Sequence, residues 1–224
     1  MVSIGAFFTA LTRRFSEVVI VVIITLLVLA TSWPLVAPQF FRVHDYVHAA
    51  RVAEITRAMQ DGQFPVRWSA NFGYGYGMPL FEFYAPLPYY FGALWYWLGM
   101  DIVLVLKVLY LTCNIGTAVG AYWLGRRLGG RSAGVLVSAM ITLAPYRAVN
   151  LYVRGSLSEA WAIMMAVFVL CGVLAVVRRE RQSWVFLTLG LIGLMLSHNL
   201  TTMMFIPVSV ILAASWWWWR ARFD

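Results

Sequence analysis

Six apolar stretches of 13 to 23 residues leave this chain few possible folds. A helix rises about 1.5 Å per residue, so about 20 apolar residues cross a hydrocarbon core of about 30 Å. Hydrophobic residues make up 62% of the chain and charged residues 12%, which excludes a soluble globular enzyme and a disordered chain. We therefore predict an all-α fold, a polytopic membrane helical bundle of about six transmembrane helices. The stretches are Val18–Val36, Ile102–Leu124, Ser132–Ala144, Ala160–Val177, Trp184–Leu196 and Leu200–Trp219.

The first stretch has two interpretations. Ala37 resembles the cleavage site of a signal peptide, but the run exceeds the usual core of about 7–15 apolar residues and Pro38 follows directly. We favour an uncleaved anchor. We treat residues 1–224 as a single transmembrane module and expect it to be a fragment of a longer chain. Cys113 and Cys171 lie within apolar stretches and are expected to be small buried hydrophobes.

Charge predicts the topology. Because the net charge of +8 comes mostly from short arginine clusters between apolar stretches, it indicates orientation in a membrane and no nucleic-acid partner. If residues 84–99 form an interfacial aromatic helix that does not cross, ten of the 17 basic residues collect on the inner side. Both termini are then cytoplasmic, residues 38–83 form a long extracytoplasmic loop, and the expected location is a bacterial inner membrane. The ten are Arg13, Arg14, Arg126, Arg127, Arg131, Arg178, Arg179, Arg181, Arg220 and Arg222.

Most unusual polar residues then face outward. Asp45 and His48 are three apart and would share one face of a helix predicted over about 46–59, which ends at Asp61-Gly62. Asp45 is either the N-cap of that helix or a catalytic carboxylate. With His44, the pair also suggests a divalent metal site, because imidazole and carboxylate suit several transition metals.

Two further outer segments carry candidate residues. Residues 71–79 alternate glycine with aromatic residues, which fits either a sugar- or lipid-binding surface or a mobile turn. Ser156 and Glu159 fit a capping box. The remaining candidates lie at the outer boundary, where they would contact a lipid phosphate, snorkel or form polar turns. They are Lys107, Arg147, Arg154, His198 and Asn199.

Together these residues resemble a known family. The chain is similar to bacterial multi-spanning membrane proteins described as "6-pyruvoyl-tetrahydropterin synthase-related", akin to the YfhO-like group of the GT-C glycosyltransferase superfamily. Two weaker motifs, Arg154-Gly155-x-x-x-Glu159 and Ser197-His198-Asn199, extend the resemblance, which covers about residues 45–199. The main string is Asp45, His48, Arg51, Gly62, Pro65, Arg67, Trp68, Gly75, Gly77, Pro79, Phe83, Tyr84, Pro86, Leu87 and Tyr89.

The resemblance implies transfer of a sugar from a polyprenyl-phosphate lipid to an outward-facing acceptor, with lipid-linked sugar and membrane lipids as partners. Asp45 matches the superfamily's acidic residue, although the better-known Asp-x-Asp form is absent, since Tyr46 and Val47 follow it. His48 would orient Asp45 or bind the acceptor. The alternative is a non-catalytic membrane subunit, or a lipid-binding or transport protein. Substrate-binding roles fall to Arg51, Arg67, Tyr84, Lys107, Arg147, Arg154, Glu159 and His198.

Overall fold

A computed structural model describes residues 4–223 of the chain, with side chains over 17–220 and at Arg222. These residues form helices joined by turns and loops, and the one β-bridge among them pairs Ser69 with Met78. The helices are α1 (Ile4–Thr31), η1 (Trp33–Val36), α2 (His48–Gln60), α3 (Leu80–Phe83), α4 (Leu87–Trp97), α5 (Ile102–Thr142), α6 (Pro145–Val149), η2 (Asn150–Arg154), α7 (Leu157–Val177), α8 (Ser183–Met195) and α9 (Asn199–Phe223).

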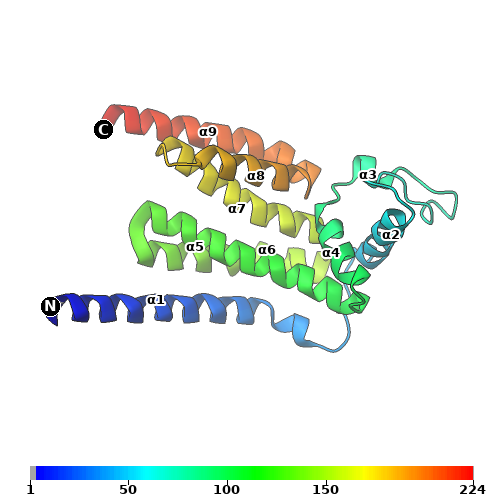
Figure 1. The fold of residues 1–224 in the computed structure, drawn as a ribbon, viewed down its shortest axis with the longest axis horizontal. Coiled ribbons are helices and arrows are strands. Elements are labelled where there is room, and N and C mark those ends of the chain that lie inside the picture. The colour runs from blue at the N-terminus through cyan, green and yellow to red at the C-terminus, as the bar shows by residue number, and fades with distance from the viewer. Residues whose placement is uncertain (1–3, 224) are drawn as a thin grey trace.

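The long helices run side by side along one axis of the molecule (Figure 1). Helices α1, α5, α7, α8 and α9 share this direction, and both ends of the chain lie at the same end of the bundle. The short helices α2, α3 and α4 gather at the opposite end. This arrangement separates the molecule into a terminal end, where the chain begins and finishes, and a loop end.

Helix α5 is a hairpin of two helical arms. Its 41 residues are interrupted at Gly129 and Gly130, and Gly130 has φ +83° and ψ −168°, a conformation that only glycine adopts readily. The arms then pack closely, since a Cβ on Gly134 would lie 2.7 Å from the ring of Tyr122. The Ser138 hydroxyl also donates to the carbonyl of Ala118 at 2.9 Å. Two of the predicted helices, Ile102–Leu124 and Ser132–Ala144, correspond to these arms.

Helix α7 is the centre of the bundle. It packs against α5, α8 and α9, and the most apolar part of it is 72% buried. Glycine permits the closest approach, because a Cβ on Gly172 would lie 2.7 Å from the Cα of Leu187 in α8. Helix α9 contrasts with α7, since only 11% of its apolar window is buried. Apolar side chains such as Met204 and Ile211 therefore face outward, as they would toward lipid.

Three helices in the described part of the chain are long and apolar enough to cross a membrane. They are Ile102–Thr142, Leu157–Val177 and the Asn199–Arg220 part of α9. The apolar helices Glu17–Thr31 and Ser183–Met195 are shorter. The structure thus confirms an all-helical fold with apolar helices long enough to span a membrane. Six crossings would require that the two shorter helices cross as well and that each arm of α5 crosses separately.

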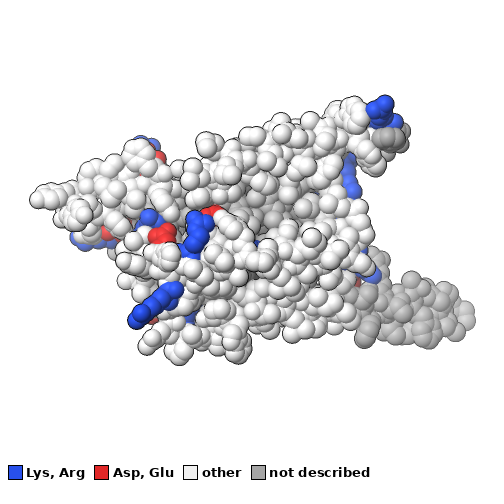
Figure 2. All heavy atoms as spheres, turned by 180° about the vertical axis from the view of Figure 1, so that it is seen from behind, with Lys and Arg blue, Asp and Glu red and all other residues white. Residues whose placement is uncertain are grey.

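Charged side chains differ between the two ends. On the face in Figure 2, acidic and basic atoms mix at the loop end, while basic atoms predominate at the terminal end. There Glu17 pairs with Arg126 at 3.6 Å and with Arg131 at 2.6 Å. Glu180 pairs with Arg127 at 3.1 Å. Within the described side chains, the arginines that the sequence placed on one side therefore share one end of the bundle, whereas the side chains of Arg13 and Arg14 lie outside the described part.

At the loop end, α2 anchors the glycine-aromatic segment. The buried Glu54 accepts hydrogen bonds from the Asn71 backbone amide at 3.0 Å and from its side-chain amide at 2.8 Å. Tyr74 and Tyr76 then extend into solvent almost fully exposed. Helix α4 covers α2 and supplies the predicted aromatic helix within residues 84–99.

Candidate functional site

The predicted site residues at the start of α2 lie against the junction of η2 and α7. The His44 amide donates to the Val153 carbonyl at 3.1 Å, and the Asp45 amide donates to the Arg154 carbonyl at 2.9 Å. These two backbone bonds join segments more than 100 residues apart. They bring the Asp45 motif and the Arg154-Gly155 motif together, as a common site requires.

His48 lies at the centre of this junction and is 1% exposed. Its Nε2 lies 2.6 Å from the Gly155 carbonyl, and its Nδ1 lies 2.9 Å from the hydroxyl of Tyr89. A carbonyl can only accept, so Nε2 carries the proton and Nδ1 accepts from Tyr89. The Asp45 carboxylate lies 3.5 Å from Nε2, so Asp45 and His48 are close together, although Asp45 precedes α2 and lies outside the helix predicted to hold them both.

Burial lowers the pKa of His48 to about 4, and the opposing attraction of Asp45 is smaller. The imidazole is therefore neutral at neutral pH. A neutral imidazole that donates from one nitrogen and accepts at the other holds its neighbours in place, and here those neighbours are Gly155 and Tyr89.

Tyr89 connects three elements through its buried hydroxyl. Besides His48, the hydroxyl contacts the Ser158 hydroxyl of α7 at 3.0 Å and accepts from Arg51 Nη1 at 3.0 Å. Burial raises the pKa of Tyr89, so the phenol stays protonated. The sequence alone predicts no role for Tyr89 or Ser158, because the hydrogen bonds of the Tyr89 hydroxyl join residues that are distant in the chain.

Arg51 has unused hydrogen-bonding capacity. Its guanidinium carbon lies 3.9 Å from the centre of the Tyr84 ring, a cation–π geometry. Its Nε is buried without a hydrogen-bond partner among the described residues. The predicted contacts Arg51 and Tyr84 therefore lie together, beside the His48–Tyr89 pair.

Gly155 has a backbone conformation that the site requires. Its φ is +71°, and a Cβ there would lie 2.5 Å from the Cβ of Val43. Its carbonyl accepts from His48 and also from the Tyr110 hydroxyl at 2.7 Å. Glycine is needed here both for the left-handed turn and for the close approach of the chain at Val43.

Arg154 and Glu159 form an ion pair at the surface. Arg154 Nη1 lies 2.9 Å from Glu159 Oε2, and it also donates to Asn150 Oδ1 and to the hydroxyl of Tyr146, each at 3.1 Å. The Tyr146 hydroxyl donates to Glu159 in turn, and this hydrogen bond raises the pKa of Tyr146. Glu159 therefore holds Arg154 in position through this ion pair.

His198 borders a separate cavity of about 300 Å³. It is lined by residues 83–85 and 198–200, and Asn199 joins the two segments by donating to the Phe83 carbonyl at 2.8 Å. Burial lowers the pKa of His198, Glu159 raises it to a smaller extent, and Arg154 lowers it further. His198 and Tyr84 therefore face one cavity, adjacent to Arg51 through the Tyr84 ring.

Three predicted substrate contacts lie elsewhere. Arg67 pairs with Glu82 at 3.3 Å on the exposed loop. Lys107 donates to the backbone carbonyls of Ala37 and Pro38. Both side chains therefore stabilise loop structure in this conformation.

Arg147 is the third of these predicted contacts, and its side chain is buried in the bundle. It is only 3% exposed, and it donates to Thr117 at 3.1 Å and to Asn114 at 2.5 Å. It is a buried cation held by neutral oxygens, whereas the sequence placed it on the outer rim. The short α6 turns its side chain into the bundle, which spacing along the chain could not reveal.

The suggested metal site does not form in this structure. Among the described side chains, no three His, Cys, Asp or Glu residues are grouped to hold an ion. Both nitrogens of His48 are engaged with protein partners, and His44 is exposed. The donor set His44, Asp45 and His48 therefore does not fit a divalent cation here.

Two predicted caps are also corrected. Helix α2 begins at His48 with Val47 as its N-cap, so Asp45 is not the cap. Ser156 is at the N-cap position of α7, but its side chain makes no capping bond. Glu159 pairs with Arg154 instead of completing a capping box.

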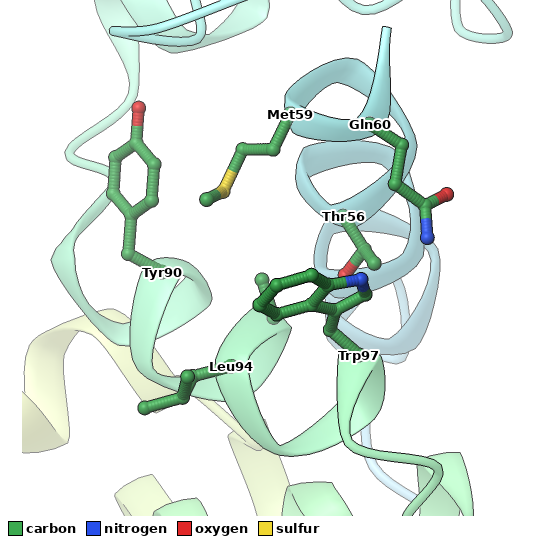
Figure 3. A pocket seen from close by; sticks show the side chains of 7 residues that line it. Thr56, Met59, Gln60, Tyr90, Leu94 and Trp97 are labelled. Carbon is green, nitrogen blue, oxygen red and sulfur yellow. The ribbon is translucent and has the colours of Figure 1, made fainter. Parts of the chain in front are cut away.

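An apolar cavity of about 210 Å³ lies between α2 and α4 (Figure 3). Met59 extends from α2 toward Tyr90 of α4, and the indole of Trp97 lies beneath it. Thr56 and Gln60 contribute the polar atoms from α2. This cavity offers apolar space at the loop end without a charged group in its lining.

The helices and their apolar surfaces define a polytopic α-helical membrane protein. Residues 81–223 match the family described as "6-pyruvoyl-tetrahydropterin synthase related domain; membrane protein", and the chain belongs to this family. A protein of Lactococcus lactis subsp. cremoris (strain MG1363), described as "Uncharacterized protein", is 25% identical over 201 residues. That match covers 87% of this chain and 32% of the relative, so the chain spans about a third of the relative's length. No solved structure matches.

Proposed function

We propose that this chain is part of a membrane glycosyltransferase of the GT-C type. It would transfer a sugar from a polyprenyl-phosphate donor to an outward-facing acceptor. The single observation that carries the proposal is the position of Asp45. This half-buried carboxylate is fixed through its own amide to the Arg154 motif and lies 3.5 Å from a buried, neutral imidazole.

The proposed topology has six crossings, with the loop end outside a bacterial inner membrane and both termini in the cytoplasm. The two arms of α5 and the helices α1, α7, α8 and α9 supply the crossings. Support comes from the arginine clusters at the terminal end, since positively charged loops favour the cytoplasm. Helix α4 would lie at the outer interface, where tryptophan and tyrosine are enriched.

Asp45 is available as a general base. Among the described side chains, no arginine or lysine forms an ion pair with Asp45, and the neutral His48 lies 3.5 Å from it, whereas Glu82 and Glu159 at the same end pair with arginines. Asp45 would accept the proton of the acceptor hydroxyl as that oxygen bonds to the anomeric carbon. The bond from that carbon to the lipid phosphate oxygen breaks, and its electron pair leaves with the phosphate.

Arginine would stabilise the leaving phosphate. Arg51 has an Nε without a hydrogen-bond partner among the described residues. It donates to the Tyr89 hydroxyl, which also contacts His48, the neighbour of Asp45. Arg154 is half exposed and is held by Glu159. A planar guanidinium suits a phosphate through paired hydrogen bonds. The apolar cavity between α2 and α4 would accept part of the isoprenoid tail.

The test is Asp45→Asn in the full-length protein, with Asp61→Asn as the matched control. Asp61 is an exposed carboxylate at the C-terminal end of α2, whereas Asp45 precedes the first residue of that helix. Transfer from a panel of radiolabelled polyprenyl-phosphate sugars is measured in membranes. Loss of a general base predicts a fall of about 100-fold or more for Asp45→Asn and little change for Asp61→Asn. Equal activity of both variants would remove the proposed base.

A non-catalytic subunit is the second candidate. The observation favouring it is that Tyr89 satisfies His48, Ser158 and part of Arg51 within the protein, as in a structural junction. A subunit of this kind predicts that Asp45→Asn leaves transfer unchanged while Tyr89→Phe disturbs assembly.

A further inference from the structure

A cavity of about 750 Å³ lies at the terminal end of the bundle, away from the candidate site. It is formed where α7 ends, where α9 ends and beside the kink of α5. Its size is within the range of about 300–1,000 Å³ that is usual for ligand sites. Neither the family match nor the proposed transferase site accounts for it.

The cavity wall combines apolar and cationic side chains. Leu128 and Val177 contribute aliphatic surface, and Trp216 and Trp219 contribute indole rings. Arg178 and Arg220 contribute guanidinium groups. A lining of this kind suits a ligand with one anionic part and one apolar part.

Helix-end carbonyls orient both arginines. Arg178 Nη2 donates to the Arg127 carbonyl at 2.6 Å, and Arg220 Nη1 donates to the Val177 carbonyl at 2.7 Å. The bond of Arg178 occupies one nitrogen of a guanidinium that carries five N–H donors, so Arg178 retains donors for an anion. Arg220 adds a second guanidinium to the lining.

The carboxylates nearby pair with other arginines. Glu17 pairs with Arg126 and Arg131, and Glu180 pairs with Arg127. Within the part of the chain whose side chains are described, Arg178 forms no ion pair with a carboxylate. Positive charge at the cavity is therefore not neutralised by these two acids.

The cavity also lies at the depth of a membrane interface. Two of its walls are the ends of α7 and α9, both long and apolar enough to span. Tryptophan prefers this depth, and basic pockets between transmembrane helices bind anionic lipid headgroups. We propose that this cavity binds an anionic phospholipid, with Arg178 and Arg220 on its phosphate and Trp216, Trp219 and Leu128 along its acyl chains.

The test compares lipid binding by two double variants of the purified chain in detergent. Arg178→Gln with Arg220→Gln removes the two cavity arginines. Arg179→Gln with Arg222→Gln removes the same charge from arginines that lie over Trp217 and Trp218 and do not line the cavity. Native mass spectrometry measures binding of phosphatidylglycerol, phosphatidylcholine and inorganic phosphate. Circular dichroism confirms that each variant is helical.

The wild-type chain should retain phosphatidylglycerol in preference to phosphatidylcholine. The cavity variant should bind phosphatidylglycerol about tenfold more weakly, and the control variant should stay within about threefold of wild type. Trp219→Ala, which leaves all charges in place, should also weaken retention. Three results would overturn the proposal. They are equal binding of the two lipids by the wild-type chain, an equal loss of binding in both double variants, and displacement of the lipid by inorganic phosphate. This result does not depend on transferase activity.

Discussion

His48 Nε2 donates to the carbonyl oxygen of Gly155 at 2.6 Å, across 107 residues of sequence. The bond joins the first residue of α2 to the turn that precedes α7. Because Asp45 lies beside His48 and Arg154 precedes Gly155, the same bond sets the relative position of both candidate functional motifs. Changes at this contact should therefore affect the stability of the whole loop end.

Gly155→Ala should destabilise the protein strongly. The residue has φ +71°, and the added Cβ would clash with Val43. The left-handed conformation alone costs about 1–2 kcal/mol for a residue with a Cβ, and the clash adds to it. We expect a clear drop in the unfolding temperature in detergent.

Gly62→Ala is the matched control. Gly62 also has a positive φ, of +84°, but a Cβ there would meet nothing within 4 Å. Gly62→Ala should therefore lower the free energy of unfolding only by the cost of the left-handed conformation, without the cost of a clash. Equal unfolding temperatures for the two variants would show that the approach of Val43 to Gly155 is not a close one.

Tyr89→Phe should destabilise the buried junction. The variant removes the donor to His48 Nδ1 and the acceptor for Arg51 and leaves both side chains short of a partner. A buried polar group without a partner costs about 1–3 kcal/mol. Chemical unfolding measures the loss. Tyr96→Phe, on the exposed side of the same helix, should be close to wild type, and a comparable loss there would contradict the network.

The stability of the loop end should fall as the pH falls from about 6.5 to about 4. Burial lowers the pKa of His48 from 6.5 to about 4 in the folded protein. Between these values the unfolded chain binds a proton that the folded chain does not, so stability decreases with decreasing pH. Above about pH 6.5 the full contribution of the neutral imidazole is present.

Unfolding temperatures at pH 7.5 and pH 5.0 measure this effect. His48→Gln should reduce the difference between the two pH values. Burial also lowers the pKa of His198, so His198→Gln shows how much of the dependence that residue contributes. A His48→Gln variant as acid-sensitive as wild type would assign the effect to other groups.

Apolar spacing predicted the helices well. The stretches Ala160–Val177 and Trp184–Leu196 correspond to α7 and α8 within three residues, and Asp61-Gly62 does end α2. These boundaries follow from local chemistry, because apolar runs form helices and glycine ends them. Asp45 and His48 also lie close together, although Asp45 precedes α2, so the predicted shared helical face is not the cause.

The polar contacts could not be predicted in the same way. The hydroxyl of Tyr89 and the carbonyl of Gly155 meet His48 only because α4 and α7 pack against α2. For Arg147 the predicted position was wrong. Its charge suggested exposure at the outer rim, but the fold buries the side chain against Asn114 and Thr117. Burial of a charge depends on tertiary neighbours, which sequence spacing does not specify.

Labelling of single cysteines in intact cells tests the central claim, that the Asp45 site faces outward. In a background where the buried Cys113 and Cys171 are replaced, Tyr76→Cys places a thiol on the exposed loop beside the site, and Arg181→Cys places one between α7 and α8 at the other end. We predict that a membrane-impermeant maleimide labels Tyr76→Cys in intact cells and Arg181→Cys only after permeabilisation. The reverse pattern would place the site in the cytoplasm and contradict the proposed function.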